Sequence, residues 1–379
     1  MGCSTSREDS RRKFLASKKQ ASLLAPTLHY SVNFVPQAAC LNSLNRPDLE
    51  SLYKTILSPF QLKALPFSNG RFLDSPSKPP ASPFNQFEEA FEELQAELIA
   101  ASETWPLNTS DSIFVFMNEV NSLQLKVLIA GPEYTPYAHG LFEFDILLHG
   151  YPEKPPKVAF LTNGNNKICF GPRLSNTGKV KLPILGTSIA SHHDELWNSE
   201  KSVSELLFML QGLIKTNNIC EGDMELESLK EDEEARRKLN KACGNIVRYC
   251  NIKFAMLEYI RNPAPWLRDF VHTYFYLKKD LILKETKKWL AAALNDDGSY
   301  DGLASMYNPR IANELGKGRY HEKLQEVVLE LEKELGKIRI HIDSPILQNF
   351  AQRERVSETS DETNMDDGVA AGEVAGKSE

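Results

Sequence analysis

Three strand-like segments within residues 113–148 constrain the fold of this chain more than any other feature. IFVFM, LQLKVLIAG and LFEFDILL are rich in the β-branched and aromatic residues that favour strands, and the turn-forming stretches NEVNS and GPEYTPYAHG separate them. YPEKPPKVAFLTN continues the pattern with a fourth segment. Segments joined by connections of this length pair with their neighbours, so the sequence predicts a four-stranded antiparallel meander.

Helical patterns lie on both sides of this predicted meander. Before it, apolar residues recur at helical intervals and acidic residues occupy the remaining surface. The apolar residues are Phe87, Phe91, Leu94 and Leu98, and the acidic residues are Glu88, Glu89, Glu92, Glu93 and Glu97. After it, SVSELLFMLQGLIKT predicts a buried helix, and further helices are expected at roughly 232–262, 264–294 and 319–338. The fold class that follows is α+β.

Composition divides the chain into five parts. We expect a basic anchor at 1–20, an α+β domain at 84–230, a helical extension at 231–345 and an acidic, disordered tail at 352–379. The pattern does not assign residues 21–83, which end in the proline-rich linker SPSKPPASP. The formal net charge of −7 and the lack of a basic, aromatic-rich surface argue against nucleic acid as a partner and leave protein partners.

Neither a metal site nor a cofactor site is expected. The 6 cysteines show no CxxC pairs and no metal-ligand spacing, so we interpret them as reduced thiols. His192, His193 and Asp194 look like a metal cluster at first sight. Adjacent side chains on an extended segment point apart, however, and a solvated loop is the better interpretation.

The first residues, MGCSTSREDSRRKFLASKKQ, carry a dual-acylation pattern. Loss of Met1 would expose Gly2 for myristoylation, and Ser6 stands where that signal prefers Ser or Thr. Cys3 is placed for palmitoylation, which would supply the second chain that stable anchoring needs. The basic residues that would attract an anionic leaflet are Arg7, Arg11, Arg12 and Lys13. We therefore expect a lipid anchor on the cytoplasmic face of a membrane.

Two short segments are specific enough to indicate a family. The first contains Gly131, Pro132, Thr135, Pro136, Tyr137, Gly140 and Phe142, and the second contains Tyr151, Pro152, Pro155, Pro156, Val158 and Phe160. Their pattern resembles the GP-x-x-TPY-x-x-G-x-F and YP-x-x-PP-x-V-x-F segments of the ubiquitin-conjugating enzymes. The surrounding sequence, over about 84–340, most resembles the conjugating domain of the very large, apollon- or bruce-type members. The resemblance implies the ubiquitin-conjugating fold: an N-terminal helix, a four-stranded antiparallel meander, then helices with a C-terminal helical extension.

The resemblance also implies a catalytic cysteine after a G-x-V stretch, but here the GKV at 178–180 is followed by Lys181. An ammonium has no lone pair, and a neutral lysine would form a stable isopeptide instead of a transferable thioester. Gly171 and Arg173 occupy the family's His and Asn positions, so the amide that stabilises the oxyanion is also missing. The first helix departs from the family too, because its acidic residues oppose docking of the activating enzyme.

These departures predict a catalytically inactive, ubiquitin-conjugating-enzyme-like protein that acts as a membrane-tethered interaction or regulatory module. Its partners would be ubiquitin, or a ubiquitin ligase or conjugating enzyme. Lys181 is expected on an exposed loop beside a shallow groove, near Arg173, and Cys169 is expected in the core. Two alternatives stay open: an active enzyme that uses Cys220 as a displaced thiol, and a scaffold with no affinity for ubiquitin.

Overall fold

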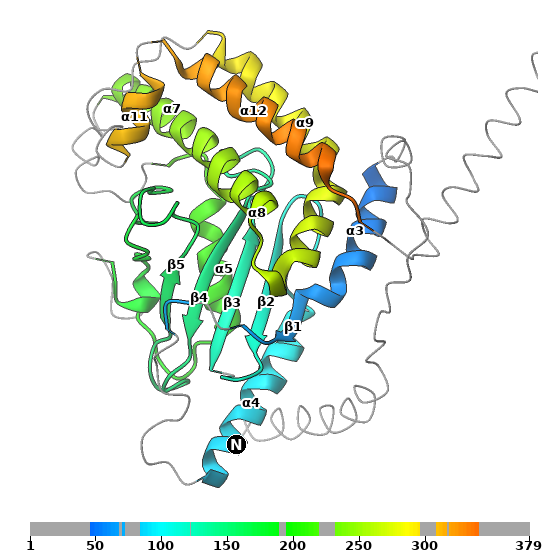
Figure 1. The fold of residues 1–379 in the computed structure, drawn as a ribbon. Helices are drawn as coiled ribbons and strands as arrows, with labels where there is room; N and C mark the ends of the chain where they lie inside the picture. Colours follow the sequence, from blue (N-terminus) through cyan, green and yellow to red (C-terminus); the bar gives the residue numbers. More distant parts are fainter. Residues whose placement is uncertain are drawn as a thin grey trace, which may run out of the picture.

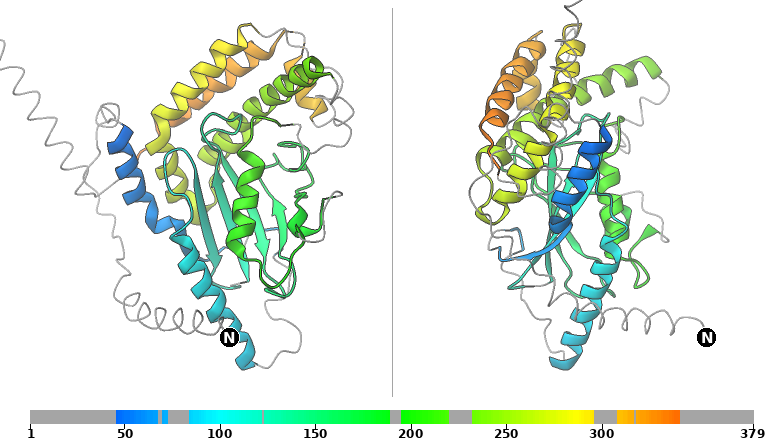
Figure 2. Two further views of the ribbon diagram at one scale, coloured as in Figure 1. Left: turned by 180° about the vertical axis from the view of Figure 1, so that it is seen from behind. Right: turned by 90° about the vertical axis from the view of Figure 1, so that its right-hand side faces the viewer.

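The structure is a computed structural model and describes residues 46–67, 70–72, 84–121, 123–188, 195–219, 232–295, 308–316 and 318–340. Several predicted features lie outside the described residues: the lipidation and basic residues of the N-terminal anchor, the acidic tail, Cys220, and the loop with His192, His193 and Asp194. In the described part, a five-stranded mixed sheet has helices on both faces (Figures 1 and 2).

The four-stranded antiparallel meander predicted from the sequence is confirmed. Its strands are β2 (Ser112–Asn118), β3 (Gln124–Ala130), β4 (Leu141–Leu147) and β5 (Lys157–Phe160). Each strand pairs with the next in antiparallel register, with Val115 opposite Val127 and Val127 opposite Phe144. Sequence order and spatial order therefore agree across these strands.

A fifth strand extends the sheet beyond the predicted four. β1 (Leu62–Leu65) pairs in parallel with β2, and Leu62 lies opposite Val115. It follows directly after α3 (Arg46–Gln61), which buries Tyr53. The sequence pattern did not assign this segment because the strand has 4 residues and pairs with a strand far along the chain.

Both faces of the sheet are covered. α9 (Arg268–Ala293) packs on one face, where the ring centroid of Phe270 lies 4.6 Å from that of Phe114. α5 (Val203–Ile214) crosses the other face (Figure 2). Every residue of β2 and β3 is buried in consequence. A partner can reach these strands only through the loops and edges of the sheet.

The helices expected before and after the meander are present. Besides α5 and α9, they are α4 (Phe84–Ser102), α7 (Glu233–Cys250), a π-helical turn (Asn251–Leu257), α8 (Glu258–Arg261) and α12 (Tyr320–Lys337). α11 (Pro309–Leu315) was not predicted, and short 3-10 turns lie at Pro183–Leu185 and Pro265–Leu267. α12 packs alongside α9 (Figure 1). Among the helices that the structure describes, none is long and apolar enough to cross a bilayer.

The π-helical turn packs against the loop that carries the first family motif. The side-chain amide of Asn251 donates hydrogen bonds to the carbonyl oxygens of Pro136 (3.1 Å) and Ala138 (3.0 Å). A Cβ on Gly140 would collide with Asn251 Oδ1. Glycine is therefore required at this point, because only a residue without a side chain permits the approach.

Candidate functional site: the hairpin that carries Lys181

Lys181 lies in a small antiparallel hairpin formed by residues 173–181. Its backbone N–H donates a hydrogen bond to the carbonyl oxygen of Arg173 (3.0 Å), and Leu174 forms a bridge with Val180. Leu174 and Val180 are buried, whereas Arg173 and Lys181 are exposed. Residues directly opposite each other in an antiparallel pair point to the same side, so the two cations share the outward side. Lys181 is thus an exposed loop residue near Arg173, as predicted.

Two more cations stand at this hairpin. Lys179 is exposed two residues before Lys181, and alternation puts both on the outward side. The side chain of Arg71, in the segment after β1, lies close to the hairpin. Its Nη1 atom is 3.3 Å from the position that a Cβ on Gly178 would occupy. We name the set Arg71, Arg173, Lys179 and Lys181 the cationic hairpin. None of the four has a carboxylate within ion-pair distance in the part of the chain that the structure describes.

The hairpin is fixed to the edge of the sheet. The N–H of Phe160, at the end of β5, donates to the carbonyl oxygen of Gly178 (2.8 Å). Asn163 donates from its side-chain amide to the carbonyl oxygen of Asn176 (3.0 Å). Gly178 itself has a φ of 83°, which favours glycine at this turn. These bonds hold the backbone of the hairpin in one position.

A cavity of about 60 Å³ lies beside Gly171. Its apolar lining includes Leu174, Leu213 and Ile219, and its polar lining includes Arg173, Thr216 and Asn218. We identify this cavity with the expected groove. Arg173 lines the cavity and Lys181 does not, so the groove is closer to Arg173. Gly171 has a φ of 131°, a conformation that L side chains rarely adopt. A histidine at this position would therefore be strained.

Among the described cysteines, Cys169 is nearest to this site in the sequence. We predicted that it lies in the core, but this prediction is wrong because the residue is only half-buried. The Asn176 N–H donates a hydrogen bond to Cys169 Sγ (3.2 Å), so the thiol is in contact with the hairpin. Burial raises the pKa of the Cys169 thiol, and the nearby Lys181 charge offsets only part of that rise. The neutral thiol is favoured, whereas a nucleophile requires the thiolate.

The acidic helix is less available to partners than the sequence suggested. Glu97 is half-buried, and its carboxylate accepts hydrogen bonds from the Tyr151 hydroxyl (2.5 Å) and the Val203 N–H (3.2 Å). It therefore fixes α4 to the start of α5. Glu93 is exposed, as expected. The side chains of Glu88, Glu89 and Glu92 lie outside those the structure describes.

The described residues contain no group of three or more His, Cys, Asp or Glu side chains that could hold a metal ion.

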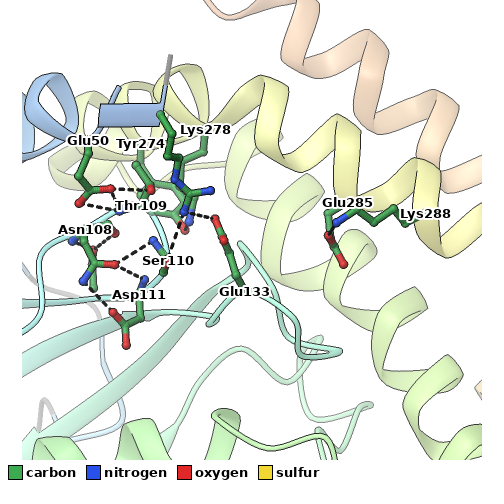
Figure 3. Close-up of polar contacts among 12 residues, drawn as sticks. Glu50, Asn108, Thr109, Ser110, Asp111, Glu133, Tyr274, Lys278, Glu285 and Lys288 are labelled. Atoms are coloured by element: carbon green, nitrogen blue, oxygen red, sulfur yellow. Dashed lines mark hydrogen bonds and ion pairs between the residues drawn. The ribbon is translucent and has the colours of Figure 1, made fainter. Parts of the chain in front are cut away.

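A buried basic cluster that no sequence pattern indicated lies where α3, the loop at 131–140 and α9 meet (Figure 3). Lys278 is 0% exposed and donates to the Tyr274 hydroxyl (3.2 Å), which donates in turn to the His139 carbonyl oxygen (3.0 Å). Burial lowers the pKa of Lys278 to about 7. Burial also lowers the pKa of His139, whose Nδ1 atom has no hydrogen-bond partner among the described residues. No local pattern signals this, because a lysine on a helix is usually solvated.

Carboxylates surround this cluster and connect α3 to the domain. Arg46 forms an ion pair with Glu133 (2.8 Å), and Glu50 accepts a hydrogen bond from Thr109 Oγ1 (2.6 Å). Figure 3 shows the contacts of Glu50 beside Lys278. Residues 46–67, within the segment that the sequence did not assign, are therefore part of the folded domain.

The sheet, its covering helices and the two motif loops define a ubiquitin-conjugating type of α+β domain. Residues 93–243 match the family model described as ubiquitin-conjugating enzyme.

Two relatives illustrate the similarity. "Probable ubiquitin-conjugating enzyme protein 17" of Caenorhabditis elegans is 36% identical over 209 residues, which are 54% of this chain and 28% of that protein. "Dual E2 ubiquitin-conjugating enzyme/E3 ubiquitin-protein ligase BIRC6" of Homo sapiens is 37% identical over 200 residues, 52% of this chain and 4% of that protein. The chain thus spans a minor part of the length of these relatives. The predicted similarity to the conjugating domain of the very large members is confirmed.

Proposed function

We propose that this chain is a ubiquitin-conjugating-enzyme-like protein that does not carry ubiquitin as a thioester and instead acts as an interaction module in a ubiquitin-related pathway. The observation that carries the proposal is the residue after the GKV stretch. Lys181 is exposed on the hairpin at the position where the family resemblance implies the nucleophilic cysteine.

The chemistry of the neighbouring residues supports this proposal. A thioester forms when a thiolate attacks an activated carboxyl group, and an amine at the same position gives a stable amide. Gly171 has no side chain that can donate a hydrogen bond, and Arg173 offers a charge in place of a neutral amide. The loss therefore involves both the nucleophile and the groups that would stabilise an oxyanion.

A loading assay tests the proposal. The full chain would be incubated with ubiquitin, the ubiquitin-activating enzyme and ATP, and analysed with and without reductant. We expect no adduct that reductant removes. An active conjugating enzyme in a parallel reaction confirms that the reagents are competent, and a reducible adduct on this chain would refute the proposal.

The alternative is an active enzyme with a displaced cysteine, Cys220. One observation favours it: Ile219, the preceding residue, lines the cavity, and its carbonyl oxygen would lie 3.7 Å from a Cβ on Gly171. If this alternative is right, Cys220→Ser abolishes a thioester that Lys181→Gln leaves intact. Absence of a thioester in the wild-type chain excludes it.

A pure scaffold is the other alternative. Its supporting observation is that every residue of β2 and β3 is buried, so ubiquitin cannot bind directly to these central strands. Titration of isotope-labelled ubiquitin with the full chain separates the two interaction roles. Specific chemical-shift changes support a ubiquitin-binding module, and their absence supports a scaffold.

The membrane tether is a further part of this proposal and is supported by the N-terminal sequence. Gly2→Ala should remove both lipids, because palmitoylation of Cys3 follows membrane sampling by the myristoylated chain. Cys3→Ser should keep one chain and give partial, reversible binding. In membrane fractions we expect wild type above Cys3→Ser, and Cys3→Ser above Gly2→Ala. Retention of Gly2→Ala in the membrane fraction would refute acylation as the anchor.

Basic residues of the same segment provide a second test of the tether. Replacement of Arg7, Arg11, Arg12 and Lys13 by glutamine should weaken binding to anionic vesicles and leave binding to neutral vesicles unchanged. The effect should be larger at low salt than at high salt, because salt screens exposed charges. Equal losses on both kinds of vesicle would contradict an electrostatic contribution.

A further inference from the structure

We propose that the cationic hairpin and the cavity beside it form a docking site for an acidic, extended polypeptide segment of a partner protein. This inference deepens the proposed function, because it names the chemistry of the partner that the module recognises. The binding it concerns does not require any thioester step.

The first argument is electrostatic. Arg173 and Lys181 lie opposite each other on the outward side of the hairpin, and like charges at such positions destabilise an antiparallel pair. Several exposed cations of the described chain form ion pairs, as Arg261 does with Glu330 (2.9 Å) and Glu334 (3.3 Å), whereas others, such as Lys287, form none with a described residue. The cationic hairpin differs because it brings four such cations together. No carboxylate among the described residues lies within ion-pair distance of them, although the whole chain has a net charge of −7. An anion from outside would supply the missing counter-charge.

The second argument is geometric. The hairpin backbone is bonded to β5 through Gly178, so the Cα positions of its cations are fixed before binding, and only the side chains lose freedom when they bind. Lys179 and Lys181 are two residues apart on an extended segment, which separates them by roughly 6.6 Å. Carboxylates at alternate positions of a second extended chain have the same spacing. The hairpin therefore matches acidic residues in an i, i+2 pattern.

The cavity indicates a side chain as the inserted group. A volume of about 60 Å³ is well below the roughly 300 to 1,000 Å³ of pockets for drug-sized ligands. Arg173 lines the cavity, and its guanidinium can bind a carboxylate with two parallel hydrogen bonds. A recessed, partly apolar pocket at the edge of the charges suits a peptide side chain better than a flat layer of lipid headgroups.

The chain's own acidic tail does not fit this pattern. Its carboxylates belong to Glu354, Glu358, Asp361, Glu362, Asp366, Asp367, Glu373 and Glu379. No two of them are separated by two positions, so the tail lacks the alternate spacing that the hairpin favours. The tail is therefore not the expected occupant, and we assign the site to a partner.

Residues 221–227, EGDMELE, do carry carboxylates at alternate positions. Replacement of Glu221, Asp223, Glu225 and Glu227 by glutamine should therefore leave peptide binding unchanged, and tighter peptide binding by that variant would assign the site to this segment of the chain.

Fluorescence anisotropy with the full chain tests this inference. The probe is a labelled AEAEAEA peptide, and the controls are EAAEAAE, which has the same number of carboxylates at a different spacing, and the neutral AQAQAQA. We expect AEAEAEA to bind most tightly, with affinity falling about tenfold between about 50 and 300 mM salt, because salt screens exposed charges.

Variants locate the binding. Combined replacement of Arg173, Lys179 and Lys181 by glutamine should weaken binding of AEAEAEA by about tenfold, which corresponds to about 1.4 kcal/mol. The matched control replaces the exposed Lys284, Lys287 and Lys333 of α9 and α12 by glutamine, removes the same charge, and should change binding by less than about twofold. Equal binding by the wild-type chain and the hairpin variant would overturn the inference.

Three other outcomes would also overturn it. Equal affinity for EAAEAAE and AEAEAEA would contradict recognition of the i, i+2 spacing. Hairpin-dependent binding to phosphatidylserine vesicles that is tighter than binding to AEAEAEA would assign the site to lipid. Binding of AEAEAEA only after deletion of 351–379 would assign the site to the chain's own tail. The loading assay decides the proposed function separately, since a thioester on this chain would refute the inactive module and leave the peptide measurement unaffected.

Discussion

The carbonyl oxygen of Arg173 accepts the backbone N–H of Lys181 at 3.0 Å, so the residues at the family's asparagine and cysteine positions face each other across one hairpin. Two cations, Arg173 and Lys181, therefore occupy positions where the family resemblance implies a neutral amide and a thiol. The same backbone element therefore accounts for both the missing chemistry and the local positive charge.

This pairing predicts a stability effect of Lys181→Glu. The substitution converts a like-charged cross-strand pair into an opposite-charged one, which should raise the free energy of unfolding by about 0.2 to 1 kcal/mol. Urea denaturation at low salt measures the change, and the gain should shrink at high salt. A variant less stable than wild type at low salt would contradict the cross-strand geometry.

Glu97→Ala should destabilise the domain. The substitution leaves the Tyr151 hydroxyl and the Val203 N–H without their charged acceptor, and each such hydrogen bond is worth about 1.5 to 3 kcal/mol. We expect a total loss of about 2 to 4 kcal/mol by chemical denaturation, less than the sum of the two bonds, because they share one acceptor group and their energies do not add. Glu93→Ala, on the exposed side of the same helix, is the control and should change stability by less than about 0.5 kcal/mol. Equal losses in the two variants would show that Glu97 is not the anchor of α4.

Lys278→Met should change how stability depends on pH. In the folded chain burial lowers the pKa of Lys278 to about 7, whereas the unfolded chain keeps a value near 10.5. The unfolded state therefore binds more protons above pH 7, and stability should rise with pH by at most about 1.4 kcal/mol per unit. Below pH 7 both states are protonated, so this lysine adds no slope and its buried charge destabilises the fold.

Unfolding of wild type and Lys278→Met between pH 6 and pH 9.5 isolates this contribution. The variant should be the more stable protein at pH 6, and its advantage should decline as the pH rises above 7. The neighbouring charges are Glu133, Arg46, Asp111 and Glu50, and they are the same in both proteins. Lys284→Met, at an exposed position on α9, should leave the wild-type profile unchanged. A constant difference between wild type and Lys278→Met at all pH values would contradict a neutral buried lysine.

The meander and the main helices could be predicted because their signals are local. Alternation, turn residues and helical spacing all lie within each segment, as in IFVFM and SVSELLFMLQGLIKT. The strand at Leu62–Leu65 could not, because it is stabilised by parallel pairing with a distant strand. Its own four residues carry too little pattern to distinguish it from a loop.

The same reason explains which site residues were missed. Glu97 and Lys278 occupy positions that local patterns assign to solvent, and only contacts from distant segments bury them. Lys181 and Arg173 were identified from the family resemblance, but their cross-strand pairing and the approach of Arg71 depend on the three-dimensional fold. Sequence identifies unusual residues, and tertiary structure decides which of them meet.

Lys181→Cys alone should not restore efficient ubiquitin transfer. The new thiol would lie beside Gly171 and Arg173, which supply neither the missing imidazole nor the missing amide. Addition of Gly171→His should not complete the rescue, because the φ of 131° at this position strains a non-glycine residue by about 1 to 3 kcal/mol. Single-turnover discharge onto free lysine measures transfer. Rapid discharge by the single variant would show that the other substitutions matter little.

Intact-mass measurement of the full wild-type chain after incubation with ubiquitin, activating enzyme and ATP tests the central claim most directly. The predicted result is the mass of the unmodified chain, both before and after treatment with reductant. A species heavier by one ubiquitin that disappears with reductant would demonstrate a thioester and contradict the account.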